Sequence, residues 1–280
     1  MRRHFFLCAA ALCAASPAWA QSDEPLPSPE EVNSGNGFTI GLGAAMVPDY
    51  EGSDDYRVIP AGAIRGKVGG VSFQTRGTYL YVDVIAGGAG KVDLDVGPIA
   101  GVRLNRTGKI KDDFVDRLPE RKTAIEVGGF AGIGFTGLTN PYDRLGVRLD
   151  VLKDVGDAHQ STTFSPNLDF STPLSRTFFI GASLSADFVG DRFADYYFSV
   201  SSLDAVASGL PAFDADGGMK NWKVGLLANQ SLSGDLRRGL SLFGLGSYSR
   251  LVGDFKRSPI ASDRGSAGQW IGGLGLAYSF

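Results

Sequence analysis

Two residues in the second half of the chain have the types and spacing of a catalytic pair. His159 and Ser161 are two positions apart, so they would lie on the same face of a β-strand. A histidine that takes the proton from a serine hydroxyl creates a nucleophile for hydrolysis, but it needs a third group to orient the imidazole. Asp157 and Asp169 are the nearby carboxylates, and no motif places either one. We therefore predict no catalytic residue and keep a hydrolase as the third of three functional alternatives.

Acidic residues are also concentrated in a short segment near the start of the chain. Four carboxylates occur there among aromatic residues and one arginine: Asp49, Tyr50, Glu51, Asp54, Asp55, Tyr56 and Arg57. Clustered carboxylates suit hard cations, but the spacing matches no standard calcium loop, and the calcium-like stretch 214–218 lacks the closing glutamate. A solvated loop with packed tyrosines and an Asp–Arg pair is the favoured interpretation, and we expect no metal and no cofactor.

The elements that must position these residues alternate between apolar and polar positions. In segment 91–105, Val92 and Leu94 alternate with Asp93 and Asp95, and period-two alternation predicts β-strands. The expected strands are 37–47, 55–66, 70–84, 91–105, 125–135, 144–151, 160–170, 177–188, 195–200, 221–230, 239–249 and 268–280. Segment 195–200 is short and could instead belong to a long loop spanning 189–220. Bacterial single-chain barrels have even strand numbers, so we predict twelve strands, with ten as the alternative.

The second face of these strands decides between a sandwich and a barrel. It carries mostly glycine and serine with isolated charges, which suits a crowded or partly wet lumen, whereas the apolar face suits lipid. In hydrocarbon a sheet must close, because an open edge leaves backbone groups unpaired. The fold prediction is therefore an all-β, closed, antiparallel transmembrane β-barrel. The lumen candidates are Arg76, Arg103, Glu126, Arg144, Arg148, Asp150 and Asp187.

Those charges allow two interpretations of the lumen. They could line a narrow channel or bind a small polar solute. Alternatively, Arg–carboxylate pairs could cross-link the strands and plug the barrel. A barrel of about twelve strands has a modest interior, which favours the plugged interpretation.

Composition and the N-terminal segment place the chain in a bacterial envelope. Residues 1–20 have a basic start, a short apolar stretch and a small-residue pattern ending at Ala20, which predicts a signal peptide cleaved near that residue. Residues 21–36 are expected to form a flexible acidic leader, and 37–280 the barrel. Both cysteines, Cys8 and Cys13, fall inside the signal peptide. The formal net charge of −3 argues against nucleic-acid binding.

The C-terminus alternates up to a terminal aromatic residue. Leu274, Leu276, Tyr278 and Phe280 occupy every second position. This pattern resembles the terminal-strand signal of bacterial outer-membrane proteins, which their assembly machinery reads. We expect a monomer surrounded by outer-membrane lipid.

Several spaced motifs resemble the MipA/OmpV family, the MltA-interacting proteins. They are the segment 47–60, Thr75-Arg76-Gly77, the segments 208–215, 248–254 and 258–260, Gly265-Ser266 and Gln269. The similarity extends over nearly all of 37–280, with no family pattern in 105–121. The resemblance implies an outer-membrane barrel that acts as a scaffold for a lytic transglycosylase and a bifunctional peptidoglycan synthase.

Three functional hypotheses follow. A non-enzymatic envelope scaffold is the prediction, motivated by the family motifs. A narrow channel or small-solute-binding barrel is the alternative, motivated by the lumen charges. The third is a lipid hydrolase, because a His-x-Ser pair resembles the catalytic pair of outer-membrane lipid A deacylases.

Overall fold

The chain forms a closed antiparallel β-barrel, as the alternation predicts. The computed structural model describes residues 37–85 and 90–280, so the expected signal peptide (1–20) and leader (21–36) lie outside the described residues. Each strand pairs with its sequence neighbours, and the last pairs with the first, for example Ile40 with Tyr278. The strands in the described part of the chain are β1 (Gly37–Pro48), β2 (Tyr56–Val68), β3 (Val71–Arg76), β4 (Tyr79–Asp83), β5 (Val92–Arg103), β6 (Ala124–Thr136), β7 (Arg144–Asp154), β8 (Thr162–Pro173), β9 (Phe178–Val189), β10 (Gly218–Ser231), β11 (Gly239–Leu251) and β12 (Gly268–Ser279).

The strand number of twelve is confirmed, but two of the expected strands are wrong. Segment 70–84 is a hairpin of two short strands, β3 and β4, which turn at Gly77 with φ +60°, a conformation that glycine adopts without steric cost. Segment 195–200 falls largely in helix α2 (Asp191–Phe198), whose buried residues Phe193, Ala194, Tyr197 and Phe198 follow helical spacing.

The two faces of the wall differ as expected. Outward positions carry exposed apolar side chains, such as Leu42, Leu226 and Leu274, and inward positions carry the charged residues described below. A closed sheet with an apolar outer surface satisfies its backbone internally and meets lipid with its side chains. No helix within 37–85 and 90–280 has both the length and the apolar character needed to cross a membrane.

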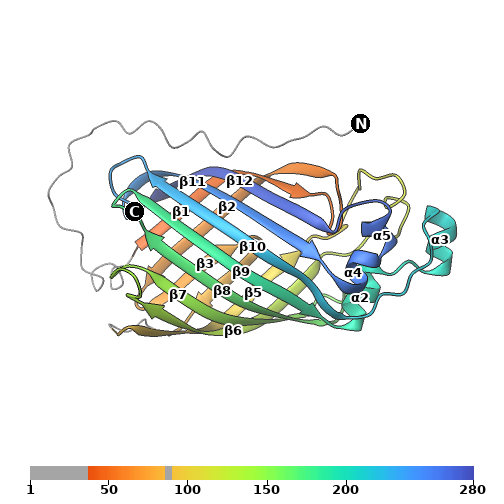
Figure 1. The fold of residues 1–280 in the computed structure, drawn as a ribbon, viewed down its shortest axis with the longest axis horizontal. Coiled ribbons are helices and arrows are strands. Elements are labelled where there is room, and N and C mark those ends of the chain that lie inside the picture. Colours follow the sequence, from red (N-terminus) through yellow and green to blue (C-terminus); the bar gives the residue numbers. More distant parts are fainter. Residues whose placement is uncertain (1–36, 86–89) are drawn as a thin grey trace.

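The two ends of the barrel are different (Figure 1). One end carries the long connections and the helices of the described residues, and the other carries short turns and the C-terminus. Bacterial barrels have short periplasmic turns and longer extracellular loops. We therefore assign the helix-bearing end to the extracellular side.

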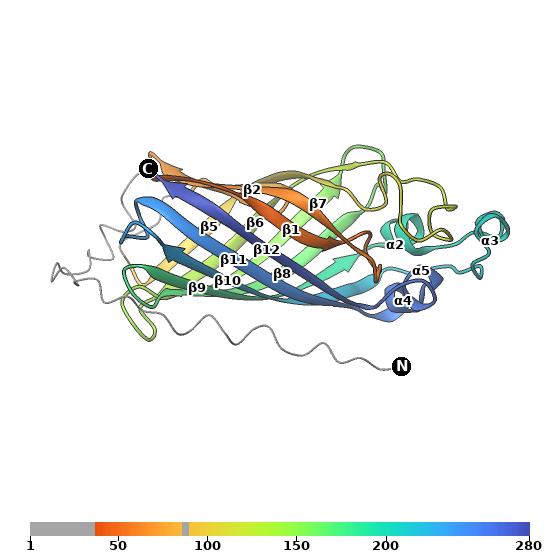
Figure 2. The same cartoon turned by 90° about the horizontal axis from the view of Figure 1, so that it is seen from above.

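The extracellular loops form a lid with its own apolar core. Helices α2, α3 (Ser202–Ser208), α4 (Gly253–Arg257) and α5 (Pro259–Ser262) lie beyond the strands in both views (Figures 1 and 2). Phe193, Tyr197, Phe198 and Phe255 belong to one buried cluster. A second cluster includes Ile260 and residues of the 104–123 loop. Packed side chains of these loops thus lie across the extracellular mouth.

Aromatic residues lie near both ends of the wall. Trp222, Tyr248 and Trp270 pack in sequence across β10, β11 and β12 on the lid side, with ring centroids 5.6 and 4.9 Å apart. On the periplasmic side Phe280 packs against Phe38 and Tyr278, at 6.1 and 4.9 Å. Such aromatic girdles are characteristic of membrane–water interfaces.

Replacing the terminal aromatic residue is expected to reduce assembly. Phe280→Ser removes an outward ring from the periplasmic girdle and from the pattern that resembles the assembly signal. We expect severalfold less heat-modifiable, folded barrel in outer-membrane fractions. Ser279→Ala, which changes the neighbouring inward residue, is the control and should assemble normally. Equal amounts of folded Phe280→Ser and wild type would contradict the prediction.

The periplasmic turn between β6 and β7 is organised by one buried carboxylate. Asp143 accepts hydrogen bonds from the backbone N–H groups of Leu138, Thr139 and Asn140 and from the Thr139 hydroxyl. The Thr139 hydroxyl contributes most to lowering the pKa of Asp143 to about 2, and the backbone donors add to it against the opposing effect of burial.

This turn predicts a pH-dependent stability difference. A carboxylate whose pKa is lowered by folding stabilises the protein above its ordinary pKa, and the stabilisation is lost as the pH falls to the folded value. The difference in unfolding free energy between wild type and Asp143→Asn should therefore be constant above about pH 5 and vanish near pH 2. Urea titrations in lipid vesicles at several pH values measure it, and a difference independent of pH would refute it.

Candidate functional site

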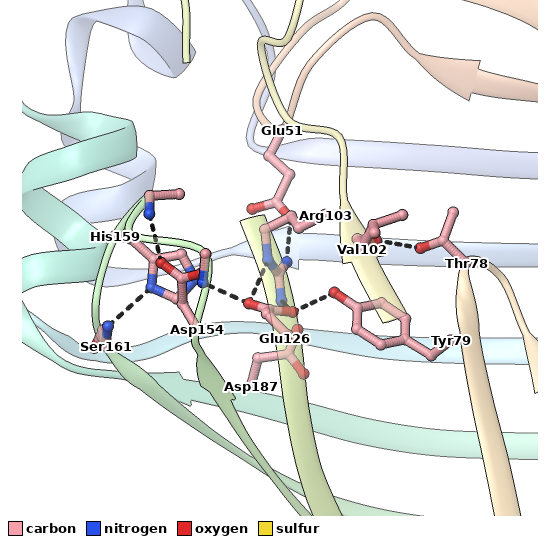
Figure 3. Close-up of polar contacts among 12 residues, drawn as sticks. Glu51, Thr78, Tyr79, Val102, Arg103, Glu126, Asp154, His159, Ser161 and Asp187 are labelled. Atoms are coloured by element: carbon pink, nitrogen blue, oxygen red, sulfur yellow. Dashed lines mark hydrogen bonds and ion pairs between the residues drawn. The ribbon is translucent and has the colours of Figure 1, made fainter. Parts of the chain in front are cut away.

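A buried carboxylate gathers three polar side chains beneath the lid (Figure 3). Glu126 on β6 is fully buried. Its Oε1 atom lies 3.1 Å from Arg103 Nε and 2.9 Å from His159 Nε2, and its Oε2 atom lies 3.2 Å from Arg103 Nη2. The Tyr79 hydroxyl donates a short hydrogen bond to Oε2. Strand register explains the assembly, because Glu126 and Tyr79 both pair with Gly101 on β5 and so point to the same side.

A second carboxylate extends this cluster toward β10. Glu51, in the β1–β2 loop, lies 3.1 Å from Arg103 Nη1 and 2.9 Å from Lys220 Nζ. Burial alone would raise the pKa of Glu51, but the positive charges of Lys220 and Arg103 outweigh it and lower that pKa below its ordinary value. Lys220 and Lys223 both approach Asp187 on β9, at 3.6 and 3.0 Å.

A separate group of ion pairs crosses the middle of the lumen. Arg148 lies 2.6 Å from Asp150 and 3.3 Å from Asp169, and Arg76 lies 3.5 Å from Asp169. The Tyr81 hydroxyl donates to Asp150 at 3.1 Å, while Arg76 and Arg148 both stack over the Tyr81 ring. Arg144 pairs with Asp95 and lies 3.9 Å from Asp93. These pairs tie together strands far apart in sequence.

Each lumen residue named from the sequence is thus inward-facing and ion-paired with a charged neighbour. Two of the pairs join candidates to each other, namely Arg103 with Glu126 and Arg148 with Asp150. The other three candidates pair with residues outside the candidate list: Arg76 with Asp169, Arg144 with Asp95, and Asp187 with Lys223. Such pairs cross-link the strands, as the plugged interpretation expected. Whether any of these residues binds a solute stays a prediction.

The acidic segment 49–55 divides between two roles. Asp49 lies 3.6 Å from Arg57, which is the expected Asp–Arg pair, but the loop is not solvated at this point, because Asp49 is buried and also accepts from the backbone N–H of Lys111. Glu51 instead reaches into the lumen. Within the described ranges no group of three or more potential ligands is placed to hold a metal ion.

The His159–Ser161 pair does not have the geometry of a base and its nucleophile. His159 Nδ1 accepts a hydrogen bond from the backbone N–H of Ser161 at 3.2 Å, so Nε2 is the protonated nitrogen and its N–H donates a hydrogen bond to Glu126. Neither nitrogen is left for the Ser161 hydroxyl. The orienting carboxylate is Glu126, not Asp157 or Asp169. The imidazole is also completely buried, and its ring centroid lies 4.9 Å from that of Phe193 in the lid.

The sequence interpretation missed several members of these clusters. Tyr79, Tyr81, Asp169, Lys220 and Lys223 all contribute to the ion pairs above. The inward parity of Asp169 could have been derived from the alternation around it. The inward direction of Lys220 could not be derived in this way, because the β9–β10 register shifts between Met219 and Asn221.

One row of residues across the opposite wall of the lumen is apolar. One row of register partners runs Leu227, Leu245, Gly273, Ala45 and Ile59 across β10, β11, β12, β1 and β2. This row points into the lumen, because Leu227 lies on the same face of β10 as Lys223, whose ammonium group donates to Asp187 in the lumen. Leu227, Leu245 and Ile59 are nevertheless 38–40% exposed. The lumen therefore contains accessible space beside an apolar surface, facing a charged one.

A closed antiparallel barrel with an apolar outer wall, aromatic girdles and a polar lumen defines the class of outer-membrane β-barrels. The family model described as MltA-interacting protein MipA matches residues 40–280. The chain belongs to this MipA family, as the motifs in the loops and the last strand suggested.

Solved structures with similar folds are remote. The COG4313 outer membrane channel from Pseudomonas putida F1 is 11% identical, with 95% of this chain and 100% of that chain covered and a TM-score of 0.46. The translocator domain of the autotransporter NalP from Neisseria meningitidis is 13% identical, with 89% and 90% covered and a TM-score of 0.37. A comparison with the curated proteins finds no match.

Proposed function

We propose that this barrel is an envelope scaffold that tethers murein-remodelling enzymes at the inner face of the outer membrane. The observation that carries the proposal is the match of the MltA-interacting protein family over residues 40–280. The family description names an interaction with MltA, a lytic transglycosylase, and a bifunctional peptidoglycan synthase is the second proposed partner. No catalytic role is proposed for His159 or Ser161.

The periplasmic end offers pre-ordered turns for such a partner. In the β10–β11 turn, Asp235 accepts from the backbone N–H of Arg237 at 2.8 Å and pairs with its guanidinium at 3.3 Å. Arg237 is half exposed. Together with the turn held by Asp143, this gives a rigid and charged surface on the assigned periplasmic side. Rigid surfaces lose little conformational entropy on binding.

A crosslinking pull-down tests the scaffold. The full-length barrel, folded in detergent, is incubated with periplasmic and membrane extract, and the captured proteins are identified. Enrichment of a lytic transglycosylase is expected for wild type and should fall severalfold for Arg237→Ala combined with Arg238→Ala. The matched control is Leu203→Ala combined with Val206→Ala on the exposed surface of α3, at the opposite end. No enrichment by a folded wild-type barrel would overturn the proposal.

A narrow channel or solute-binding barrel is the second candidate, and one observation favours it. Leu227, Leu245 and Ile59 face inward and remain accessible. A completely plugged lumen would bury these side chains.

A further inference from the structure

The barrel wall has a break in strand pairing on its extracellular half. Strand β2 pairs with β3 only from Arg65 to Val68, whereas its pairing with β1 continues to Tyr56. The segment 56–63 therefore pairs with β1 on one side and, within the described residues, with no strand on the other, and Ile64 contacts β3 only through the Thr75 side chain. The cause is the short β3–β4 hairpin, which turns at residues 77–78.

The unpaired side of β2 presents specific backbone groups. Ile64 directs its N–H to Thr75 Oγ1 at 2.9 Å, so even-numbered residues of β2 direct their backbone groups toward this side. The carbonyl of Tyr56, another even-numbered residue, points to the same side and accepts from Lys111 Nζ at 2.6 Å. Between them lie Val58, Pro60 and Gly62. Pro60 has no N–H to leave unpaired, and proline is confined in sheets to such edges.

The break is bounded on its other sides. The Thr78 hydroxyl at the hairpin tip donates to the Val102 carbonyl of β5. Above it, the 104–123 loop crosses from β5 to the β1–β2 loop, where Asn105 Oδ1 accepts from the Glu51 N–H at 3.0 Å. Val58 is 73% exposed and Ile59, which points the opposite way, is 38% exposed. Both faces of β2 are accessible here, and we call this break in strand pairing, between segment 56–63 and the hairpin tip at 77–78, the window.

An apolar surface leads inward and downward from this window. The inward residues of β2 are Ile59, Ala61 and Ala63, and Ile59 ends the apolar row that crosses from β10. Their register partners on β1 are Ala45, Gly43 and Gly41. The Phe243 ring packs against Gly41, whereas Ala63 is exposed and Ala61 is half-buried, so the accessible path for an apolar chain runs along β2.

An unpaired cation lies at the end of this surface. Arg65 is the next inward residue of β2 after Ala63, and it is exposed. Within the part of the chain that the structure describes, its guanidinium has no ion pair or hydrogen bond, unlike those of Arg76, Arg103, Arg144 and Arg148. The charged groups that act on it are Arg76 and Arg144, both positive. Thr39 and Gln74 flank it in the register.

We propose that the lumen binds a long-chain carboxylate that enters from the membrane through this window. The carboxylate pairs with Arg65, and the alkyl chain lies along Ala63, Ala61 and Ile59. Arg65 is six positions along the strand from Ile59, a length of about 20 Å. The apolar wall removes the chain from water, and the unpaired guanidinium supplies the charge that a carboxylate complements. This inference makes the solute-binding candidate specific and does not depend on the scaffold role.

Photocrosslinking in proteoliposomes tests the proposal. The probe is a diazirine-bearing palmitate analogue, and labelled residues of the full-length barrel are identified by mass spectrometry. Labelling of inward residues of β1, β2 and β12 is expected, with competition by palmitate but not by methyl palmitate. Arg65→Gln should reduce this labelling at least tenfold. Arg57→Gln is the matched control, because Arg57 is an inward arginine of the same strand that is paired with Asp49.

A second variant tests the path of the alkyl chain independently of the carboxylate contact. Ala63→Trp fills the path while leaving Arg65 in place, and it should also abolish inward labelling. Heat-modifiable migration establishes that each variant is folded. Labelling confined to outward, lipid-facing residues would overturn the proposal, as would equal labelling of wild type and Arg65→Gln or equal competition by the neutral ester. The pull-down described above should be unchanged in Arg65→Gln, so the two proposals can fail separately.

Discussion

Replacing Glu126 by alanine is expected to lower the free energy of unfolding by about 3–5 kcal/mol. The side chain is fully buried and is the shared partner of Arg103, His159 and Tyr79. Its removal leaves a largely buried guanidinium with Glu51 as its remaining carboxylate partner. Removing one member of a buried pair costs more than the pair contributes, because the remaining charge stays desolvated.

Urea unfolding in lipid vesicles, followed by tryptophan fluorescence, measures this effect. The control is Asp235→Ala, which removes the partner of Arg237 in a pair that is about half exposed on both sides. An exposed pair contributes about 0–1 kcal/mol. A loss below about 1 kcal/mol for Glu126→Ala would show that water or a rearranged Glu51 replaces the carboxylate.

The second large effect is expected in the lid. Phe193 is fully buried, lies 4.8 Å from Tyr197, and is covered by Arg103 and Lys220 at 5.1 and 5.2 Å from its ring centre. Its truncation to alanine removes contacts within the lid and contacts between lid and lumen together. Phenylalanine-to-alanine changes in a core cost about 3–5 kcal/mol. We expect α2 to detach while the barrel stays closed.

Two measurements follow the lid of Phe193→Ala. Limited proteolysis should cleave the 190–217 loop at least tenfold faster than in wild type, and planar-bilayer recordings should show currents that wild type lacks. Leu203→Ala on α3 is the control, since that side chain is 84% exposed. Faster cleavage without current would mean that the ion pairs in the middle of the lumen close the barrel alone. Unchanged cleavage would contradict the lid assignment.

The faces of the strands could be predicted from the sequence because period-two alternation is a local property. Val92 and Leu94 point outward and Asp93 and Asp95 inward without reference to any distant residue. Segment 195–200 was wrongly predicted to be a strand because tyrosine and phenylalanine favour strands. The buried residues of α2 begin at Phe193, before that segment, and their helical spacing is visible only over the longer range 191–198.

The partners within the lumen could not be predicted, because they depend on register and on the stagger of the barrel. Alternation places Glu126 and Arg103 on the inner face, but it does not place His159 beside them. That contact requires the β7–β8 loop to fold back over β6, where His159 reaches Glu126. The hairpin at Gly77 was missed for a related reason, since one glycine inside an alternating segment does not distinguish a turn from a strand.

Pro60 also affects how the chain can associate with other copies before it is inserted into the membrane. A strand whose neighbour is missing can recruit a strand from another molecule, and this is a common route to aggregation. At Pro60 an incoming strand would find no N–H donor, and the ring would obstruct its approach. The short β3–β4 hairpin leaves this side of β2 without a partner strand, and Pro60 makes the same side a poor template for a strand from a second copy of the chain.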